Sequence, residues 1–286
     1  MANTAFLKQR ISSIKNTRQI TKAMELVSAS KMRRAQDFAK LSRDYAEAAS
    51  DLLAHLSTLA EVKTHPFFNH RSVKNKLYVL ITSNSGLAGA YNYNILKILS
   101  TAVLDDRSHG ISSKVISIGK QGAHFASRLV GVELVAVYHA FGDRPSANDI
   151  KPILDTIVRM YDSSEIDEVD IIYTQPKSNL LQIAKSMEIL PIKPISDGEL
   201  NFTNFEPTVN EVLSYSIERL LDAIIWQAVL DSLASEHSMR MMAMKNATDN
   251  AGDLIDQYTL KFNTARQSGI TQELAEITGG FEALNS

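Results

Sequence analysis

The sequence contains no cysteine. Disulfides, thiolate metal sites and cysteine nucleophiles are therefore excluded, and this usage is typical of a reducing compartment. Long hydrophobic runs are missing as well, because the longest uncharged stretch, Leu77 to Leu96, is interrupted by serines, asparagines and glycines. We therefore expect no transmembrane segment and, by default, a cytoplasmic location.

Proline and glycine are missing from Leu7 to Ala60. Stepping through this stretch alternately by four and three residues meets apolar side chains at eleven of sixteen positions. A mean period of 3.5 keeps one helix face turned toward a partner helix, so residues 1–60 are predicted to form one coiled-coil helix. The sixteen seam positions are Leu7, Ile11, Ile14, Arg18, Thr21, Glu25, Ser28, Met32, Ala35, Ala39, Ser42, Ala46, Ala49, Leu53, Leu56 and Ala60.

A second long helix is predicted at the other end, over residues 208–286. Thr208 and Glu211 have the spacing of a capping box, directly after Pro207. From Val209 to Ala265, the same stepping meets apolar residues at thirteen of seventeen positions, and Gly252 and Gly269 are the only interior glycines before Gly279. Because the domain left between the helices is too small to cover either seam, we expect the two helices to cover each other.

The charge of the two ends favours pairing, and an antiparallel pair is the simplest arrangement because one helix lies at each terminus with a domain between them. Residues 1–40 carry nine Lys or Arg against two acids, whereas residues 211–286 carry eleven acids against five bases. Opposite charge would attract the two helices. The polar seam positions Arg18, Thr21, Glu25 and Ser28 have two open interpretations: they specify the register of the pair, or they face another protein.

Between the helices, residues 75–200 are predicted to form an α/β domain. The strand candidates Leu77–Thr82, Val115–Ile118, Val132–Tyr138 and Val169–Tyr173 alternate with helical patterns. The helical patterns cover Ala90–Leu104, Gly119–Leu129 and Ala147–Tyr161. The fold class is therefore α/β, with a Rossmann-like central domain, a mostly parallel sheet and the coiled coil. A turn rich in proline, from Pro191 to Pro207, leads back to the second helix.

No catalytic, metal or cofactor site emerges from the motifs. The turn Gly86-Leu-Ala-Gly89 follows a strand but lacks the spacing of a dinucleotide or phosphate loop, so a tight packing turn is favoured. Gly119-Lys-Gln-Gly122 is weaker still. His237 has no second histidine at helical spacing and lies on the seam, which favours a packed side chain over a metal ligand.

The terminal helices resemble the γ subunits of F-type ATP synthases. The N-terminal motif is Arg10-Ile-Ser-Ser-Ile-Lys-Asn-Thr-Arg-Gln-Ile-Thr-Lys-Ala-Met24, and the C-terminal motifs run from Ser235 to Ala251, from Asn263 to Gln267 and from Ile270 to Leu274. The central turn departs from the family, because Asn84 and Ala88 replace an acid and a cysteine. The regulatory cysteines of the chloroplast branch are absent, and we read the first 35 residues as mature helix rather than a transit peptide. The chain therefore resembles the bacterial type.

This resemblance implies a function without catalytic residues or cofactors. The chain would be the central-stalk rotor of the F1 sector, turning inside an α3β3 hexamer and coupling proton flow to ATP synthesis or hydrolysis. Its partners would be the α, β and ε subunits and the c-ring, at the cytoplasmic face of a bacterial cell membrane, where it would be peripheral. By motif match, its contacts with β would fall on Met24, Arg240, Arg266, Gln267, Thr271 and Glu273.

Two other classes of function remain as alternatives. A nucleic-acid-binding coiled coil could use the basic residues from Lys8 to Arg34, but the nearest aromatic residues for stacking, Phe6 and Phe38, lie just outside that range. We expect the acidic second helix to neutralise that charge. A nucleotide-dependent enzyme is disfavoured because a phosphate loop and paired titratable groups are missing from the sequence.

Overall fold

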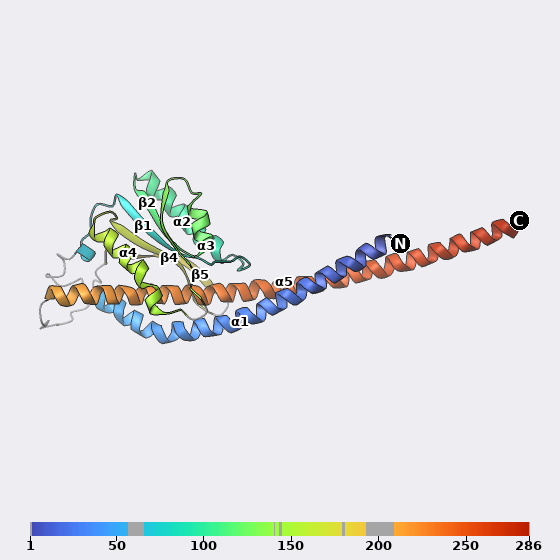
Figure 1. Cartoon of the computed structure of the whole chain (residues 1–286), viewed down its shortest axis with the longest axis horizontal. Helices are drawn as coiled ribbons and strands as arrows, with labels where there is room; N and C mark the ends of the chain where they lie inside the picture. The colour runs from blue at the N-terminus through green and yellow to red at the C-terminus, as the bar shows by residue number, and fades with distance from the viewer. Residues whose placement is uncertain are drawn as a thin grey trace. The chain divides into compact units, whose positions relative to one another are not determined.

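The computed structural model describes residues 2–56, 66–139, 141–142, 145–178, 181–192 and 209–285. The chain divides into two compact units, each of which includes part of both terminal helices. Unit 1 consists of Met1–Val27 with Met241–Ser286, and unit 2 consists of Ser28–Arg240. Helix α1 (Ala2–Leu56) and helix α5 (Val209–Asn285) each continue through both units, which confirms the two predicted long helices (Figure 1).

The two helices run antiparallel within each unit. In unit 1, the hydroxyl oxygens of Thr21 and Thr248 lie 2.9 Å apart, and Arg18 lies beside Gly252. In unit 2, Arg43 pairs with Asp231 at 3.2 Å. Lys31 lies close enough to Glu236 for its positive charge to oppose part of the rise that burial causes in the pKa of Glu236. In both units, residue numbers rise along α1 as they fall along α5, as an antiparallel pair requires.

The predicted seam is the inner face of α1. Of the positions from Leu7 to Leu53, only Arg18 is exposed, and alanine fills the seam through the middle of the helix. The fully buried seam residues are Leu7, Thr21, Ser28, Ala35, Ala39, Ala46, Ala49 and Leu53. Small side chains at a helix contact permit a short distance between the helix axes, so α1 and α5 approach closely over this alanine stretch.

Two of the four polar seam positions, Arg18 and Thr21, lie against residues of α5. Thr21 and Thr248 are both buried and lie within hydrogen-bonding distance, and Thr21 also donates to the Arg18 carbonyl. The Arg18 guanidinium lies beside Gly252, where an added Cβ would be in ordinary van der Waals contact at 3.8 Å. The contact between Thr21 and Thr248 forms at one alignment of the helices, which favours the interpretation that Thr21 specifies register.

The central domain contains a five-stranded sheet in the order β3-β2-β1-β4-β5. The first four strands are parallel, and β5 runs antiparallel to β4, so the prediction of a mostly parallel sheet is confirmed. The strands are β1 (Asn75–Ile81), β2 (Ser112–Ile118), β3 (Val132–Tyr138), β4 (Glu168–Pro176) and β5 (Gln182–Leu190). Strand β5 was not among the predicted strands.

Helices cover both faces of this sheet (Figure 1). Alternate residues of β1 point to opposite faces: Tyr78 and Leu80 pack with α2, while Leu77 and Val79 pack with α4 and α5. The covering helices are α2 (Tyr91–Ser108), α3 (Lys120–Ala126) and α4 (Lys151–Asp162), with short 3-10 turns η2 (Pro66–Phe68) and η3 (Ala147–Asp149). The domain is thus a three-layer α/β structure.

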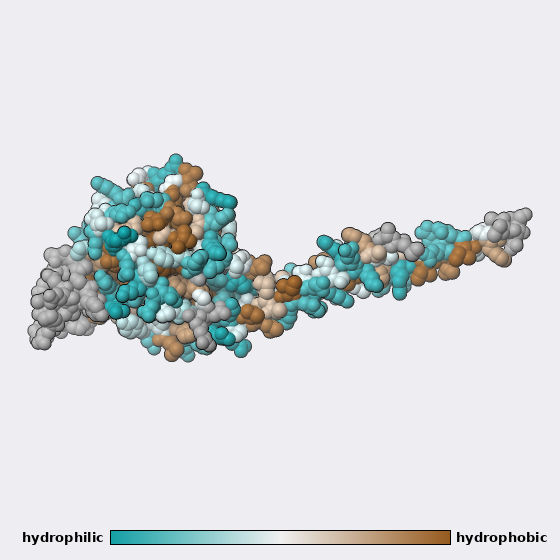
Figure 2. Space-filling model, viewed as in Figure 1, coloured by the Kyte–Doolittle hydropathy of each residue, from teal (hydrophilic) through white to brown (hydrophobic). Residues whose placement is uncertain are grey.

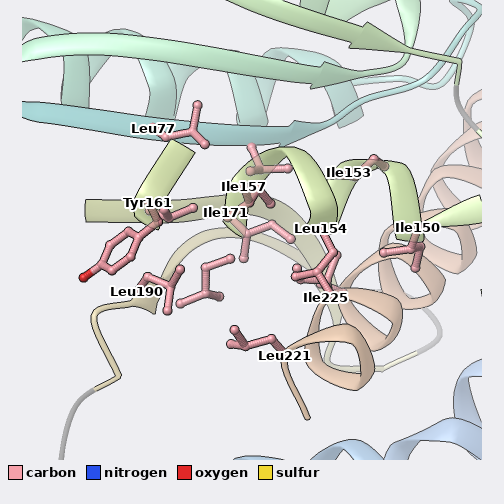
Figure 3. Close-up of a cluster of buried hydrophobic side chains, with 14 of the residues drawn as sticks. Leu77, Ile150, Ile153, Leu154, Ile157, Tyr161, Ile171, Leu190, Leu221 and Ile225 are labelled. Carbon is pink, nitrogen blue, oxygen red and sulfur yellow. The ribbon is translucent and has the colours of Figure 1, made fainter. Parts of the chain in front are cut away.

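The larger core joins the sheet to α5. In Figure 3, side chains of α4 such as Ile157 lie between those of the sheet and those of α5, including Leu221 and Ile225. Ala49 and Leu53 of α1 belong to the same cluster. The long helices are therefore part of the domain's own core rather than attachments to it.

Several predictions fall outside the described residues. The first is the cap formed by Thr208 with Glu211, because neither Thr208 nor the side chain of Glu211 is described. The others are the proline-rich segment after Ile192 and the predicted boundaries at residues 60, 200 and 208. The division of the chain at 1–60, 75–200 and 208–286 therefore stays a prediction.

Candidate functional site

Four of the six predicted contact residues lie close together on the C-terminal part of α5. Arg266, Gln267, Thr271 and Glu273 all have exposed side chains. The Thr271 hydroxyl donates to the Gln267 carbonyl one turn earlier, so its hydrogen bond is satisfied within the helix. All four side chains are carried by α5 and are exposed to solvent.

An exposed apolar stripe runs between these polar residues, and the sequence analysis did not identify it. Ile270, Leu274, Ile277 and Phe281 are each at least half exposed. Their spacing of four, three and four residues puts them on one face of a helix. Figure 2 shows hydrophobic residues gathered along this end of α5. The coiled-coil stepping was followed only to Ala265, although the periodicity of these four residues could have revealed the stripe.

The polar residues flank this stripe on both sides. At 3.6 residues per turn, Arg266 and Glu273 lie along one edge of the apolar stripe, and Gln267 and Thr271 lie along the other. Extending the register of Thr21 with Thr248 places the start of α1 near Gln267. The residues that follow on α5 therefore extend beyond the described part of α1, which agrees with their exposure from Ile270 to Phe281.

The other two predicted contact residues lie elsewhere. Met24 is half buried on α1 in unit 1. Arg240 belongs to unit 2, is only 8% exposed, and donates to Glu236 at 2.7 Å. The structure therefore brings together four of the six residues and directs the Arg240 side chain into its own domain.

The glycine turn after β1 is part of the environment of Arg240. Its guanidinium lies 3.4–3.5 Å from the carbonyl oxygens of Ser85 and Gly86 and from the Ser85 hydroxyl. The Ser83 backbone N–H donates to the Asn92 side chain at 3.1 Å, which closes the turn onto α2. This turn presents carbonyl oxygens to a cation, which is the opposite polarity to a phosphate loop.

The second glycine motif has a packing role. A Cβ on Gly119 would lie 2.2 Å from the Thr82 carbonyl oxygen, and its φ of 99° is unfavourable for other residues. A Cβ on Gly122 would lie 2.6 Å from the Ser117 hydroxyl oxygen. Both glycines therefore allow α3 to approach the ends of β1 and β2 closely.

One cluster of carboxylates could in principle hold a metal ion. Oxygen atoms of Glu168, Asp170 and Glu188 lie within 4.8 Å of one another. However, the Lys76 ammonium pairs with Glu168, and with Asp170 at 3.1 Å. A cation already belonging to the chain therefore neutralises part of this charge, and the cluster is better explained as an ion-pair network.

Burial raises the pKa of three acids on α5, of which Asp222 is the first along the helix. Burial raises the pKa of the Glu236 carboxyl, and Arg240 only partly opposes this effect. Burial likewise raises the pKa of Asp231, opposed in part by Arg43. His237 is also buried, with Nδ1 3.4 Å from the Arg240 guanidinium, in agreement with a packed histidine. These groups lie inside unit 2 and not beside the exposed patch.

Among the described helices, none combines the length and the apolar character that a membrane span needs. This includes α2, which contains the end of the long uncharged stretch.

Solved structures share this fold. A chain of the Tetrahymena thermophila mitochondrial ATP synthase central stalk/c-ring structure matches with a TM-score of 0.64 and 24% identity, covering 80% of this chain and 99% of that one. A chain of the Euglena gracilis mitochondrial ATP synthase rotor matches with a TM-score of 0.66 and 15% identity, and the match covers 94% of this chain and 99% of that one. A chain of the Euglena gracilis mitochondrial ATP synthase OSCP/F1/c-ring structure matches with a TM-score of 0.69 and 17% identity, and the match covers 99% of this chain and 95% of that one.

The sequence itself carries the family assignment. The sequence profile of the ATP synthase family matches residues 3–284, which is nearly the whole chain and includes both long helices and the sheet between them. The chain therefore belongs to the ATP synthase family, in the γ-subunit family whose members are structural rotor subunits and not catalytic by themselves.

Proposed function

We propose that this rotor subunit turns as the central stalk of the F1 sector inside an α3β3 hexamer and couples proton flow to ATP synthesis or hydrolysis at the β subunits. The observation that carries this proposal is the antiparallel pair of α1 and α5, in a chain that matches the γ-subunit family from residue 3 to residue 284. A paired rod with one sheet domain built into its core can transmit rotation along its length.

Rotation can act on the β subunits only through differences in contact energy. A rotor that contacted every β conformation equally would shift none of their equilibria. The α5 surface is suited to unequal contacts, because one side has the apolar stripe and other sides are polar. Each of three otherwise identical β subunits would therefore meet a different face and be biased toward a different nucleotide affinity.

The contacts with β are assigned to the patch at the end of α5. Arg266 and Glu273 on one edge, and Gln267 and Thr271 on the other, would hydrogen-bond to β while the apolar stripe between them packs against the surrounding subunits. Arginine is well suited to carboxylate partners, because its planar guanidinium forms paired hydrogen bonds. Met24 on α1 is assigned a supporting role in these contacts, whereas Arg240, which is buried in unit 2, would act from within the chain.

The remaining partners follow from the same proposal. The ε subunit and the c-ring would bind the end of the rotor that carries the α/β domain. The chain would be peripheral, on the cytoplasmic face of a bacterial cell membrane, and would have no nucleic-acid partner. Ion transport would take place in other subunits. This chain would receive torque from them or deliver torque to them.

A double substitution tests the proposal. Arg266→Ala with Gln267→Ala removes one polar side chain from each edge of the patch, while alanine maintains the helix. In an enzyme reconstituted with this chain, we expect normal helix content in the isolated chain and ATP synthesis reduced about tenfold or more, the size of effect that lost charged contacts have at an interface.

The matched control is Asp256→Ala with Gln257→Ala, a charged residue and an amide that are also exposed on α5. This control should retain most of the activity, because it lies outside the patch. Full ATP synthesis by the Arg266 and Gln267 variant would contradict the assignment of the contacts. Failure of the unsubstituted chain to assemble with α and β subunits would contradict the proposed function itself.

A further inference from the structure

The sheet of unit 2 has a topological switch point between β1 and β4. From β1 the chain continues to β2 and β3 on one side, whereas β4 and β5 lie on the other. In open α/β sheets, ligands usually bind at the carboxyl ends of the strands that flank such a point. In this chain those ends are the residues around Thr82, after β1, and Thr174, near the end of β4.

Helix α5 occupies this position. The Ser232 hydroxyl lies 2.7 Å from the Tyr91 hydroxyl and accepts from the Thr174 backbone N–H at 3.3 Å. The Ser235 hydroxyl lies 3.2 Å from the Thr174 carbonyl and 2.8 Å from the Gln182 side-chain oxygen. Both serines are completely buried, so α5 satisfies polar groups at the strand ends that would otherwise need a ligand or water.

Glu236 and Arg240 extend this contact to the glycine turn. The two side chains form a buried ion pair one helical turn apart, and each residue is 8% exposed. The Arg240 guanidinium then reaches three oxygen atoms of Ser85 and Gly86. Each of these contacts is long for a hydrogen bond, but together they give the charged group several acceptors on one side.

The polarity of the turn fits this occupant. A phosphate loop presents backbone N–H groups to an anion, whereas this turn presents carbonyl oxygens to the guanidinium. Glu236 holds the guanidinium from the other side, and Glu236 is itself buried. The place where a related fold would bind a diffusible ligand is therefore filled by a side chain of the long helix.

We propose that Glu236 and Arg240 form a clamp that locks the turn Ser83–Gly89 to α5, so that the sheet domain and the long helix rotate as one body. This role rests on the proposed rotor function. Arg240 is the last residue of unit 2, so the clamp holds the domain to the helix at the point where that unit ends. Arg240 acts here as a positioning residue within its own chain and not through a contact with β.

Hydrogen exchange on the isolated full-length chain tests the contact. Arg240→Ala should increase amide exchange in residues 83–92 about tenfold or more, because the turn loses its anchor to α5, while helix content stays unchanged. Lys245→Ala, at an exposed position a little further along α5, is the matched control and should leave this exchange as it is. Unchanged exchange in Arg240→Ala would overturn the clamp whether or not the chain is a rotor.

A cross-link tests the mechanical role. Because the chain has no cysteine, Ser85→Cys with Arg240→Cys gives two unique thiols that a short bifunctional reagent can join. In a reconstituted enzyme, the unlinked variant should lose about half or more of its ATP-driven proton pumping, and the cross-link should restore it. A residue that worked by contacting β would not be rescued in this way.

Two results would overturn the mechanical role: normal pumping by the unlinked double variant, or a cross-linked variant that pumps no better than the unlinked one. The single variants Ser85→Cys and Arg240→Cys, treated with the same reagent, control for modification of one thiol and should show no rescue. If the unsubstituted chain supports no pumping at all, the rotor function fails, while the exchange result for the clamp still stands.

Discussion

The hydroxyl oxygens of Thr21 and Thr248 lie 2.9 Å apart, one on each long helix, and both side chains are buried. Thr21 also donates to the Arg18 carbonyl, and Thr248 lies 2.8 Å from the Met244 carbonyl. A buried polar pair in the seam is most stable at the alignment that brings the two hydroxyls together. This pair therefore opposes sliding of one helix along the other.

A double-mutant cycle measures that interaction. Thr21→Val and Thr248→Val should each lower the free energy of unfolding by about 0.5–1.5 kcal/mol, because each leaves a buried hydroxyl with one partner fewer. The double variant should cost less than the sum, because both hydroxyls are then gone. Urea unfolding of the full chain gives the values, and Thr264→Val, at an exposed position, is the control. Strict additivity would mean that the two hydroxyls do not interact.

Two glycines of the sheet domain allow steric clash to be separated from backbone strain. Gly119 and Gly131 both have positive φ, of 99° and 87°, but only Gly119 has backbone atoms in the space that a Cβ would fill. Gly131→Ala should cost about 1–2 kcal/mol from strain alone. Gly119→Ala adds a clash with Thr82 and should cost more than about 3 kcal/mol. Equal destabilisation of the two variants in thermal or urea unfolding would refute the close approach of α3 to β1.

Asp231 should make the native state less stable as pH rises. Its pKa in the native state is raised by burial, although Arg43 and Gln227 oppose this, so the protonated form is favoured on folding. That contribution is complete below the ordinary pKa of 3.8 and is lost as pH rises through the native pKa. The stability of Asp231→Asn relative to the parent should therefore improve from pH 3.8 toward neutrality.

Unfolding by urea at several pH values would show this change in the difference between variant and parent. Asp256→Asn, at an exposed position on the same helix, is the control. A difference between Asp231→Asn and the parent that does not vary with pH would mean that the native state does not perturb this carboxyl.

Leu274 in the apolar stripe should matter for assembly and not for folding. It is 60% exposed, so Leu274→Asp should change the free energy of unfolding by no more than about 0.5 kcal/mol. The same change should weaken binding to α and β subunits by about tenfold or more, because it puts a charge into an apolar contact. Leu260→Asp is the control, since Leu260 is 69% exposed but lies outside the stripe. If the two variants assembled equally well, the apolar stripe would not be part of the surface that contacts the α and β subunits.

The long helices could be predicted from sequence because their periodicity is sustained over many turns. The polar seam residues were identified as well, but their two interpretations could not be separated without the positions of Thr248 and Gly252 opposite them. The sheet was recognisable where a strand contains a continuous apolar run, as in Leu77–Ile81 of β1, which is covered on both faces.

Strand β5 could not be predicted in the same way. Its sequence includes Ala184, Lys185, Met187 and Glu188, which individually favour helix or disfavour strand. Tertiary partners decide its conformation: it pairs with β4, Ser186 donates to Asp170, and the Lys185 ammonium lies 5.1 Å from the Tyr173 ring centroid. Local propensity cannot show such distant neighbours.

The candidate site was predictable only in part. The motif match selected Arg266 and Gln267, and the structure shows these side chains exposed. The same match grouped Arg240 with them, although its partners are Glu236 and the turn at Ser85. Spacing along one helix does not reveal which other segment of the chain packs against each of its turns. The partners of Arg240 could therefore be identified only from the folded structure.

The alanine seam of α1, which includes Ala35, Ala39, Ala46 and Ala49, also bears on how a rotating shaft would deform. Two helices that approach closely form a slender rod, and the resistance of a rod to twisting falls steeply as its radius decreases. Larger seam residues such as Leu7, Ile11 and Ile14 keep helices further apart. Taken alone, the alanine stretch would be the part of the pair that twists most easily. It lies in unit 2, however, where Ala49 and α5 share one core with the sheet, so the sheet domain braces the pair where it is narrowest.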